Sequence, residues 1–158
     1  MSLLTIDEAR AQCRVEADYP AEQLQPYIDG AEDDAAGYLN RAIFADQATL
    51  DAARDAVPAA LGAAQDAYDA AVIAAAAINN DAEAQATLDV ADARLADAKQ
   101  SAARTVNGIV VDAGIKSAVR LTLGHLFANR EAVVAGQAME LPLGAQSLLR
   151  PKRRVMMP

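Results

Sequence analysis

The chain has few of the residues from which catalytic sites and covalent frameworks are usually built. Its 158 residues include one cysteine, one histidine and no tryptophan. The single thiol, Cys13, excludes a disulfide framework and a multi-thiolate metal site. No apolar run approaches the ~20 residues of a membrane span, and residues 1–5 lack the basic and apolar regions of a secretory signal. We expect a soluble protein of a reducing cytoplasm, with no membrane contact.

Alanine dominates what is present. There are 40 alanines, against 44 other hydrophobic residues. Alanine has the best helix propensity and loses no side-chain entropy in a helix. The composition therefore predicts an all-α protein whose helices approach closely around a thin core, and the length predicts one domain.

Charge is distributed unevenly along the chain. The net charge of −8 divides into −7 over residues 1–47, −5 over 48–105 and +4 over 106–158. A mostly acidic body argues against wrapping nucleic acid by phosphate neutralisation. The basic end could dock on an acidic partner.

Two flanking segments carry amphipathic helix patterns. Thr5 and Glu8 form a capping-box pattern that predicts a short helix to about Cys13. Pro20 and Pro26 are both candidates for the start of a second helix, which ends near residue 40. One face of that helix carries Leu24, Tyr27, Ile28, Ala31, Ala35, Tyr38 and Leu39. Asp112 is expected to cap a later helix. That helix carries Ile115, Val119, Leu123, Leu126 and Phe127.

The middle of the chain differs in kind. Residues 48–105 hold 24 alanines, and Leu50, Leu61 and Val72 recur every eleven residues, close to the period of a straight helix. A turn at 79–81 separates this pattern from a second helical pattern with an alanine seam. We predict an antiparallel helical hairpin inserted into the domain, with a kink or restart at Pro58. The hairpin could be a plain spacer, or its tip could make contacts.

Candidate catalytic and metal-binding residues are few. His125 lies in an apolar helix with no Cys, Asp or Glu at ligand spacing, which favours a packed or interface histidine. Cys13 has only Arg14 beside it to activate a thiolate, which favours a small buried residue. The acidic run 32–34 lacks the alternation of a calcium loop and is interpreted as a solvated helix face. We expect no enzyme, no cofactor and no metal site.

The C-terminal segment, residues 147–158, is basic and flanked by prolines. Residues 147–149 could form a last helical turn, and we expect the rest to be an extended tail that becomes ordered on a partner. One interpretation is that its bases grip nucleic acid; the other, favoured here because no aromatic residues interleave the bases, is insertion into a protein groove. The candidate partner-binding residues are Ser147, Leu148, Leu149, Arg150, Lys152, Arg153, Arg154, Val155, Met156 and Met157.

The two flanks together resemble a known family. The matching stretches are residues 5–10, 24–32, 38–41, 115–131 and 141–151, and the most specific part is Asn-Arg-Glu at 129–131 followed by Pro-Leu-Gly-x-x-x-Leu-Leu. They resemble the head–tail connector (adaptor) proteins of long-tailed bacteriophages. The resemblance covers about 1–47 and 106–151.

The resemblance implies a structural virion protein without catalysis. It implies a small helical bundle that forms a homo-oligomeric ring, expected to be a dodecamer, beneath the portal protein. The ring extends the DNA channel, through which DNA passes without specific binding, and it receives a neck stopper or tail-terminator protein. Made in the host bacterial cytoplasm, the chain would reside at the head–tail interface of the virion. In this family the segment after the bundle reaches toward the portal or a neighbouring subunit, here residues from about 147 to 158.

The expected organisation follows from both arguments. The fold is all-α: an adaptor helical core (1–47 and 106–146), an inserted Ala-rich antiparallel helical hairpin (48–105) and an extended basic tail (147–158). The family has a shorter connection where the hairpin stands, so we expect the hairpin to point outward from the ring, where it cannot obstruct the channel. The alternative function is a nucleic-acid-associated packaging or regulatory protein that binds through its basic tail.

Overall fold

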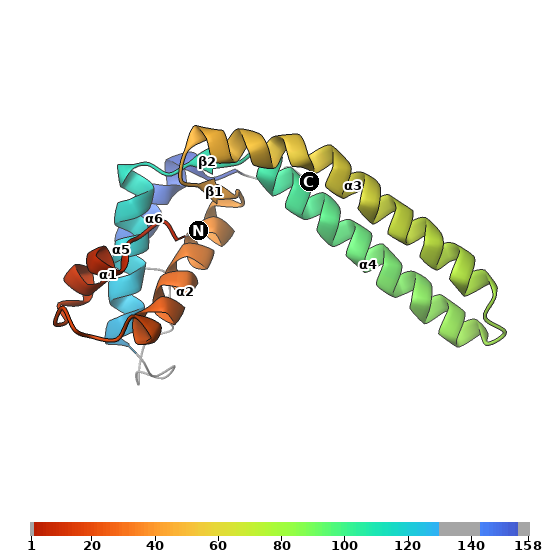
Figure 1. The fold of residues 1–158 in the computed structure, drawn as a ribbon, viewed down its shortest axis with the longest axis horizontal. Helices are drawn as coiled ribbons and strands as arrows, with labels where there is room; N and C mark the ends of the chain where they lie inside the picture. Colours follow the sequence, from red (N-terminus) through yellow and green to blue (C-terminus); the bar gives the residue numbers. More distant parts are fainter. Residues whose placement is uncertain (1, 130–142, 155–158) are drawn as a thin grey trace. The chain divides into compact units, whose positions relative to one another are not determined.

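A computed structural model describes residues 2–129 and 143–154, which are mostly helical, and the expected all-α character is confirmed (Figure 1). The chain divides into two compact units. One, here called the bundle unit, comprises Met1–Asp46 and Ile109–Pro158; the other, the hairpin unit, comprises Gln47–Gly108. None of the helices in the described ranges combines the length and apolar character that a membrane span requires.

The bundle unit is built around helix α5 (Ala113–Ala128). This helix packs against α1 (Ile6–Cys13), α2 (Ala21–Leu39) and α6 (Leu143–Leu149), and a 3₁₀ turn, η1 (Arg150–Lys152), continues α6. The starts of α1 and α5 follow the predicted capping patterns, and Pro20 rather than Pro26 precedes α2.

The core of this unit lies where the apolar stripes of α2 and α5 meet. The face predicted for the second helix is buried at its leucine, isoleucine and alanine positions, whereas its tyrosines lie at the core edge. Tyr19 and Tyr27 both contact the ring of Phe127 edge-on, with centroid separations of 6.0 and 5.6 Å. The largest fully buried side chains are Leu24, Ile28, Leu39, Ile115, Leu123, Leu149 and Val119.

A two-stranded parallel sheet, which the sequence patterns did not predict, belongs to the bundle unit. Strand β1 (Ile43–Phe44) pairs with β2 (Ile109–Val110), with Ile43 opposite Ile109. The amide of Ile109 donates to the carbonyl of Ala42 at 2.9 Å, and that of Val111 donates to Phe44 at 2.8 Å. The sheet thus joins the two points at which the chain leaves and re-enters this unit.

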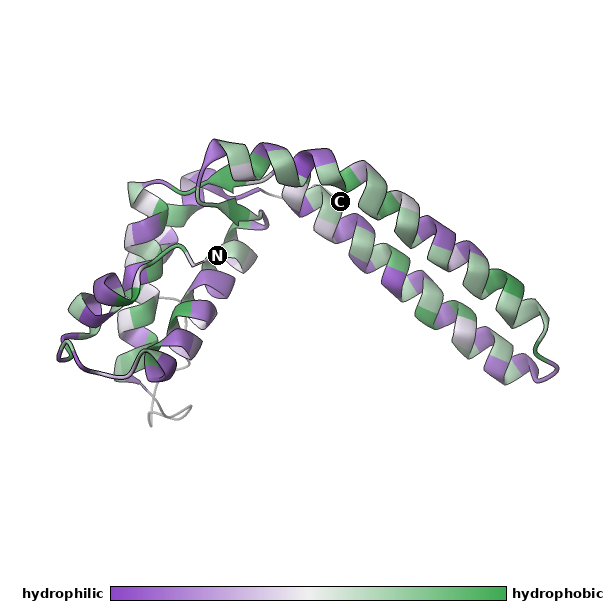
Figure 2. Ribbon diagram, in the orientation of Figure 1, coloured by the Kyte–Doolittle hydropathy of each residue, from purple (hydrophilic) through white to green (hydrophobic). Residues whose placement is uncertain are grey.

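The hairpin unit consists of α3 (Gln47–Ala76) and α4 (Asp81–Val106), which pack along their lengths. Asn80 caps α4 by accepting a hydrogen bond from the amide of Ala82 at 3.0 Å. Pro58 lies inside α3 without ending it, and Figure 1 shows a continuous helix that bends along its length. Figure 2 shows both helices mostly in the pale green of weakly hydrophobic residues, interrupted by purple polar ones. Buried side chains here are Leu50, Ala75, Ala91 and Leu95.

Candidate partner-binding site

The predicted partner-binding segment is folded for most of its described length. Residues 147–149 complete α6 and 150–152 form η1. The helical turn that the sequence left open at residues 147–149 is present, whereas the expectation of an extended tail is wrong for residues 150–152. The physical reason is Leu149, which is fully buried in the core of the bundle unit and fixes the helix that carries it. Val155, Met156 and Met157 lie outside the described residues.

A salt bridge holds η1 against the start of α5. The ammonium of Lys152 donates to the carboxylate of Asp112, whose other oxygen accepts from the amide of Ile115 at 3.0 Å as the N-cap of α5. The hydrogen bond from Lys152 is the main cause that lowers the pKa of Asp112, and the backbone donor adds to it. One carboxylate thus serves both a helix cap and the C-terminal segment.

The next two residues contact the end of α2. The guanidinium of Arg153 lies 4.9 Å from the ring centroid of Tyr38, a cation–π geometry. The amide of Arg154 donates to the carbonyl of Leu39 at 3.0 Å, which satisfies a carbonyl that the end of α2 leaves free. Residues 152–154 are therefore fastened to the bundle unit at two of its helix ends.

The outward side of α6 remains available to a partner. Leu143 is 78% exposed, and Leu148, Ser147 and Arg150 are also exposed. Apolar side chains beside an arginine are typical of protein-binding surfaces, in which aromatic residues and arginine are enriched and lysine is depleted. We name the set Ser147, Leu148 and Arg150 the tail surface.

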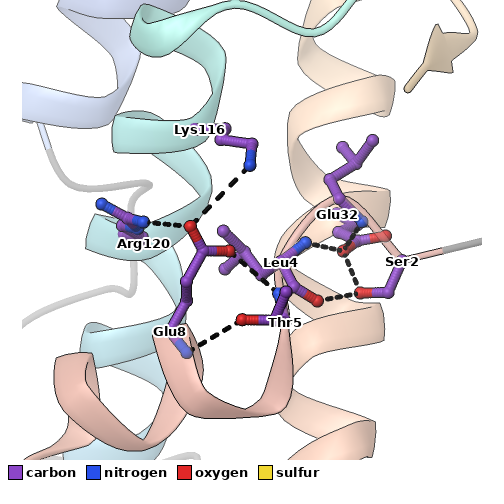
Figure 3. A network of polar contacts seen from close by, with 8 residues as sticks. Ser2, Leu4, Thr5, Glu8, Glu32, Lys116 and Arg120 are labelled. Atoms are coloured by element: carbon purple, nitrogen blue, oxygen red, sulfur yellow. Dashed lines mark hydrogen bonds and ion pairs between the residues drawn. The ribbon is translucent and has the colours of Figure 1, made fainter. Parts of the chain in front are cut away.

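A second polar network, missed from the sequence, ties α1 to α5 (Figure 3). One carboxylate oxygen of Glu8 lies 2.5 Å from the guanidinium of Arg120 and 3.8 Å from the ammonium of Lys116. The other oxygen accepts from the amide of Thr5 at 2.9 Å. This backbone donor is the main cause that lowers the pKa of Glu8, followed by the two cations. The capping box predicted the Thr5 contact, but no local pattern points to residues on a distant helix.

The acidic run 32–34 divides into two environments. Glu32 accepts hydrogen bonds from the hydroxyl of Ser2 and the amide of Leu3, both at 2.7 Å (Figure 3). Asp33 and Asp34 are exposed. The interpretation as a solvated face is therefore wrong for Glu32, which anchors the N-terminal segment on α2.

His125 and Cys13 are both half-buried at the edge of the bundle core. His125 Nδ1 lies 3.3 Å from the side-chain nitrogen of Asn129, and its Nε2 is buried without a hydrogen-bond partner in the described structure. Across residues 2–129 and 143–154, no group of three or more His, Cys, Asp or Glu side chains is arranged to hold a metal ion.

Comparison of the chain with protein-family models, with curated proteins and with solved structures finds no match.

Proposed function

We propose that the protein is a head–tail connector of a long-tailed bacteriophage, a structural virion protein that assembles as a ring under the portal. The proposal starts from the resemblance of the two flanks to that family. Its partners would be the portal protein, a neck stopper or tail-terminator protein, and further copies of itself. DNA would pass through the channel without specific binding.

One structural observation supports the proposal most directly. Stretches that carry the resemblance lie far apart in the sequence, yet their described parts fold into a single unit. Glu8 of the first stretch contacts Arg120 of the fourth. Leu149 of the last stretch is buried in the same cluster as Leu39 of the third. The bundle unit is thus a candidate for the shared family core, and residues 130, 131, 141 and 142 of the matching stretches lie outside the described structure.

Charge is consistent with a passive channel. The bundle unit carries a net charge of −3, from −7 over residues 1–46 and +4 over residues 109–158. Acidic surfaces repel phosphates, so that DNA would slide rather than adhere. We retain the expectation that the hairpin unit points away from the channel of the ring.

The geometry of the tail supports the nucleic-acid alternative less well than it supports the connector. Lys152 pairs with Asp112, and Arg153 lies over Tyr38. Phosphate binding would require these bases to leave partners within the same unit. An exposed basic strand without such partners would have been better suited to the alternative.

The experiment is co-sedimentation with the portal ring from the same genome. Truncation after residue 146 is unsuitable because it removes Leu149 from the core. Two better variants are a chain that stops after Arg154 and the double substitution Leu148→Glu with Arg150→Glu on the tail surface. The matched control, Arg14→Glu with Gln23→Glu at exposed positions of the bundle unit, makes the net charge more negative by the same amount.

We expect the full chain and the control to sediment with the portal, and the tail-surface variant to lose at least about tenfold in affinity, as expected at an interface hot spot. If all variants bind the portal, the connector proposal stands, but the tail surface is not what anchors the chain to the portal. Failure of the full chain to bind an intact portal would reject the connector. Salt-sensitive DNA binding by the free chain would then favour the alternative.

A further inference from the structure

One face of the hairpin unit is hollowed between its two helices. Two hollows of about 460 and 430 Å³ lie between α3 and α4. Ala53 and Val57 line one hollow, and Ala64 and Tyr68, eleven residues later, line the other. Eleven residues make slightly more than three helical turns, so both hollows open on nearly the same face. We call the two hollows together the hairpin groove.

The second helix repeats with the same step. Thr87 lines the hollow nearer the α3–α4 turn, and Ala98 lines the other. Both helices thus repeat their lining positions along the hairpin, and most of the lining residues are small. Small side chains allow the backbone of a further helix to approach closely.

Few charged side chains line the groove, although the hairpin is acidic and the carboxylate of Asp92 forms a hydrogen bond with Tyr68 of the hollow nearer the turn. The only charged residues that line either hollow are Glu83 and Arg94, both in the hollow nearer the turn. Neither has an ion-pair partner within the hairpin unit, where every residue is described. None of the aspartates of α3 lines a hollow; these are Asp51, Asp55, Asp66 and Asp69.

The hairpin leaves apolar surface on this face uncovered. Val90, which stands between Glu83 and Arg94 in the sequence, lines the same hollow and is 50% exposed. A pair of helices forms one layer, and stable architectures cover the apolar face of a layer with a second one. The groove therefore has the character of an interface, and its two unpaired charges indicate what covers it.

We propose that the hairpin groove binds the hairpin groove of a second copy of this chain, in an antiparallel two-fold arrangement that pairs Glu83 of each copy with Arg94 of the other. A two-fold interface is self-complementary: when residue i contacts residue j, residue j contacts residue i. A two-fold axis across the groove, midway between these residues, lays α4 against α4 in opposite directions. Each copy then contributes one acid and one base at equal distances from the axis, with Val90 close to it.

Charge selects this arrangement over the parallel one. A two-fold axis along the hairpin would place α4 of one copy against α3 of the other. Glu83 and Arg94 would then face the alanine-lined part of α3, and both would lose water without gaining a partner. Burying an unpaired charge is costly, so the parallel arrangement is disfavoured.

This pairing does not depend on the proposed function. Subunits of a single cyclic ring are related only by rotation about the ring axis, so they cannot form an antiparallel two-fold contact. The pairing would join free chains, or chains of two separate rings. If the chain binds the portal but its hairpins do not pair, only the pairing is rejected. If the hairpins pair but the chain does not bind the portal, only the connector proposal is rejected.

The test is sedimentation equilibrium of the full chain under reducing conditions, with charge reversals in the groove. We compare the unchanged chain, Glu83→Arg, Arg94→Glu, the double variant, and an equimolar mixture of the two single variants. Asp66→Arg is the matched control, because it changes net charge as Glu83→Arg does but lies outside both hollows. Helix content measured by circular dichroism verifies that every variant is folded.

The unchanged chain and the control should dimerise, and each single reversal should weaken the dimer about tenfold or more, because two like-charge contacts form at every interface. The double variant should recover the dimer. The mixture should form the heterodimer, in which each acid again meets a base. The proposal would be overturned if the unchanged chain is monomeric, or if the charge reversals leave the affinity of the dimer unchanged.

Discussion

The carboxylate of Glu8 in α1 lies 2.5 Å from the guanidinium of Arg120 in α5, although 112 residues separate them in the chain. The same carboxylate accepts from the amide of Thr5 at 2.9 Å. Glu8 therefore both caps its own helix and fixes that helix on α5. The N-terminal and C-terminal flanks of the hairpin unit are joined through this side chain.

Replacing Glu8 by Gln should destabilise the bundle unit by about 1 kcal/mol, the upper end of the range for a partly exposed ion pair. Glutamine can still complete a capping box, so the loss reports the contacts with Arg120 and Lys116. Hydrogen exchange of the α1 and α5 peptides measures it, with Asp33→Asn as the control. Equal protection in both variants would contradict a stabilising role for the network.

Stability of the bundle unit should fall in acid. The folded state holds the pKa of Glu8 below 4.5 and that of Asp112 below 3.8, so it binds fewer protons than the unfolded state there. The stabilisation is complete above these values and is lost as pH falls through the lowered ones. Urea unfolding between about pH 6 and about pH 3 measures the loss. Glu8→Gln and Asp112→Asn should each flatten the profile, and unchanged slopes would reject this origin.

Leu149→Ala should destabilise the bundle unit by about 2–5 kcal/mol, because it opens a cavity in a fully packed core. Its neighbour provides the control. Leu148 is 36% exposed, and Leu148→Ala should cost less than about 1 kcal/mol. Thermal unfolding distinguishes the two. Equal effects would mean that α6 does not contribute to the core as described.

The bundle unit should fold without the hairpin unit. None of the residues of its described hydrophobic core comes from 47–108, and β1 pairs with β2 on either side of the insertion. We would replace 47–108 with about fourteen Gly and Ser residues, because the chain must run back between two parallel strands, and such crossovers take a dozen residues or more. Edge-on contacts of Phe127 with Tyr19 and Tyr27, observed by nuclear magnetic resonance, should persist. Their loss would make the hairpin a required part of the fold.

Local patterns in the sequence predicted much of the bundle unit. The capping residues Thr5 and Asp112 act as expected, and the periodic faces of α2 and α5 are buried. These features depend on neighbours within about one helical turn, which is why a sequence pattern can reveal them. The charge of the segment after residue 146 marked it as a candidate, and a helical turn at 147–149 was left open, but the 3₁₀ turn that follows was not predicted.

What the sequence could not predict depends on distant contacts. Strands β1 and β2 have two residues each, too few to produce a period. Lys152 meets Asp112 only once the helices have packed. The buried position of Leu149 likewise follows from tertiary packing, and a basic segment with prolines around it gave no sign of it.

The most direct measurement of the connector proposal is electron microscopy of the purified portal ring mixed with the full chain. The proposal predicts a second, coaxial ring beneath the portal, with an open central channel and with hairpins outside it. Portal rings without added density, or hairpins that cross the channel, would contradict it.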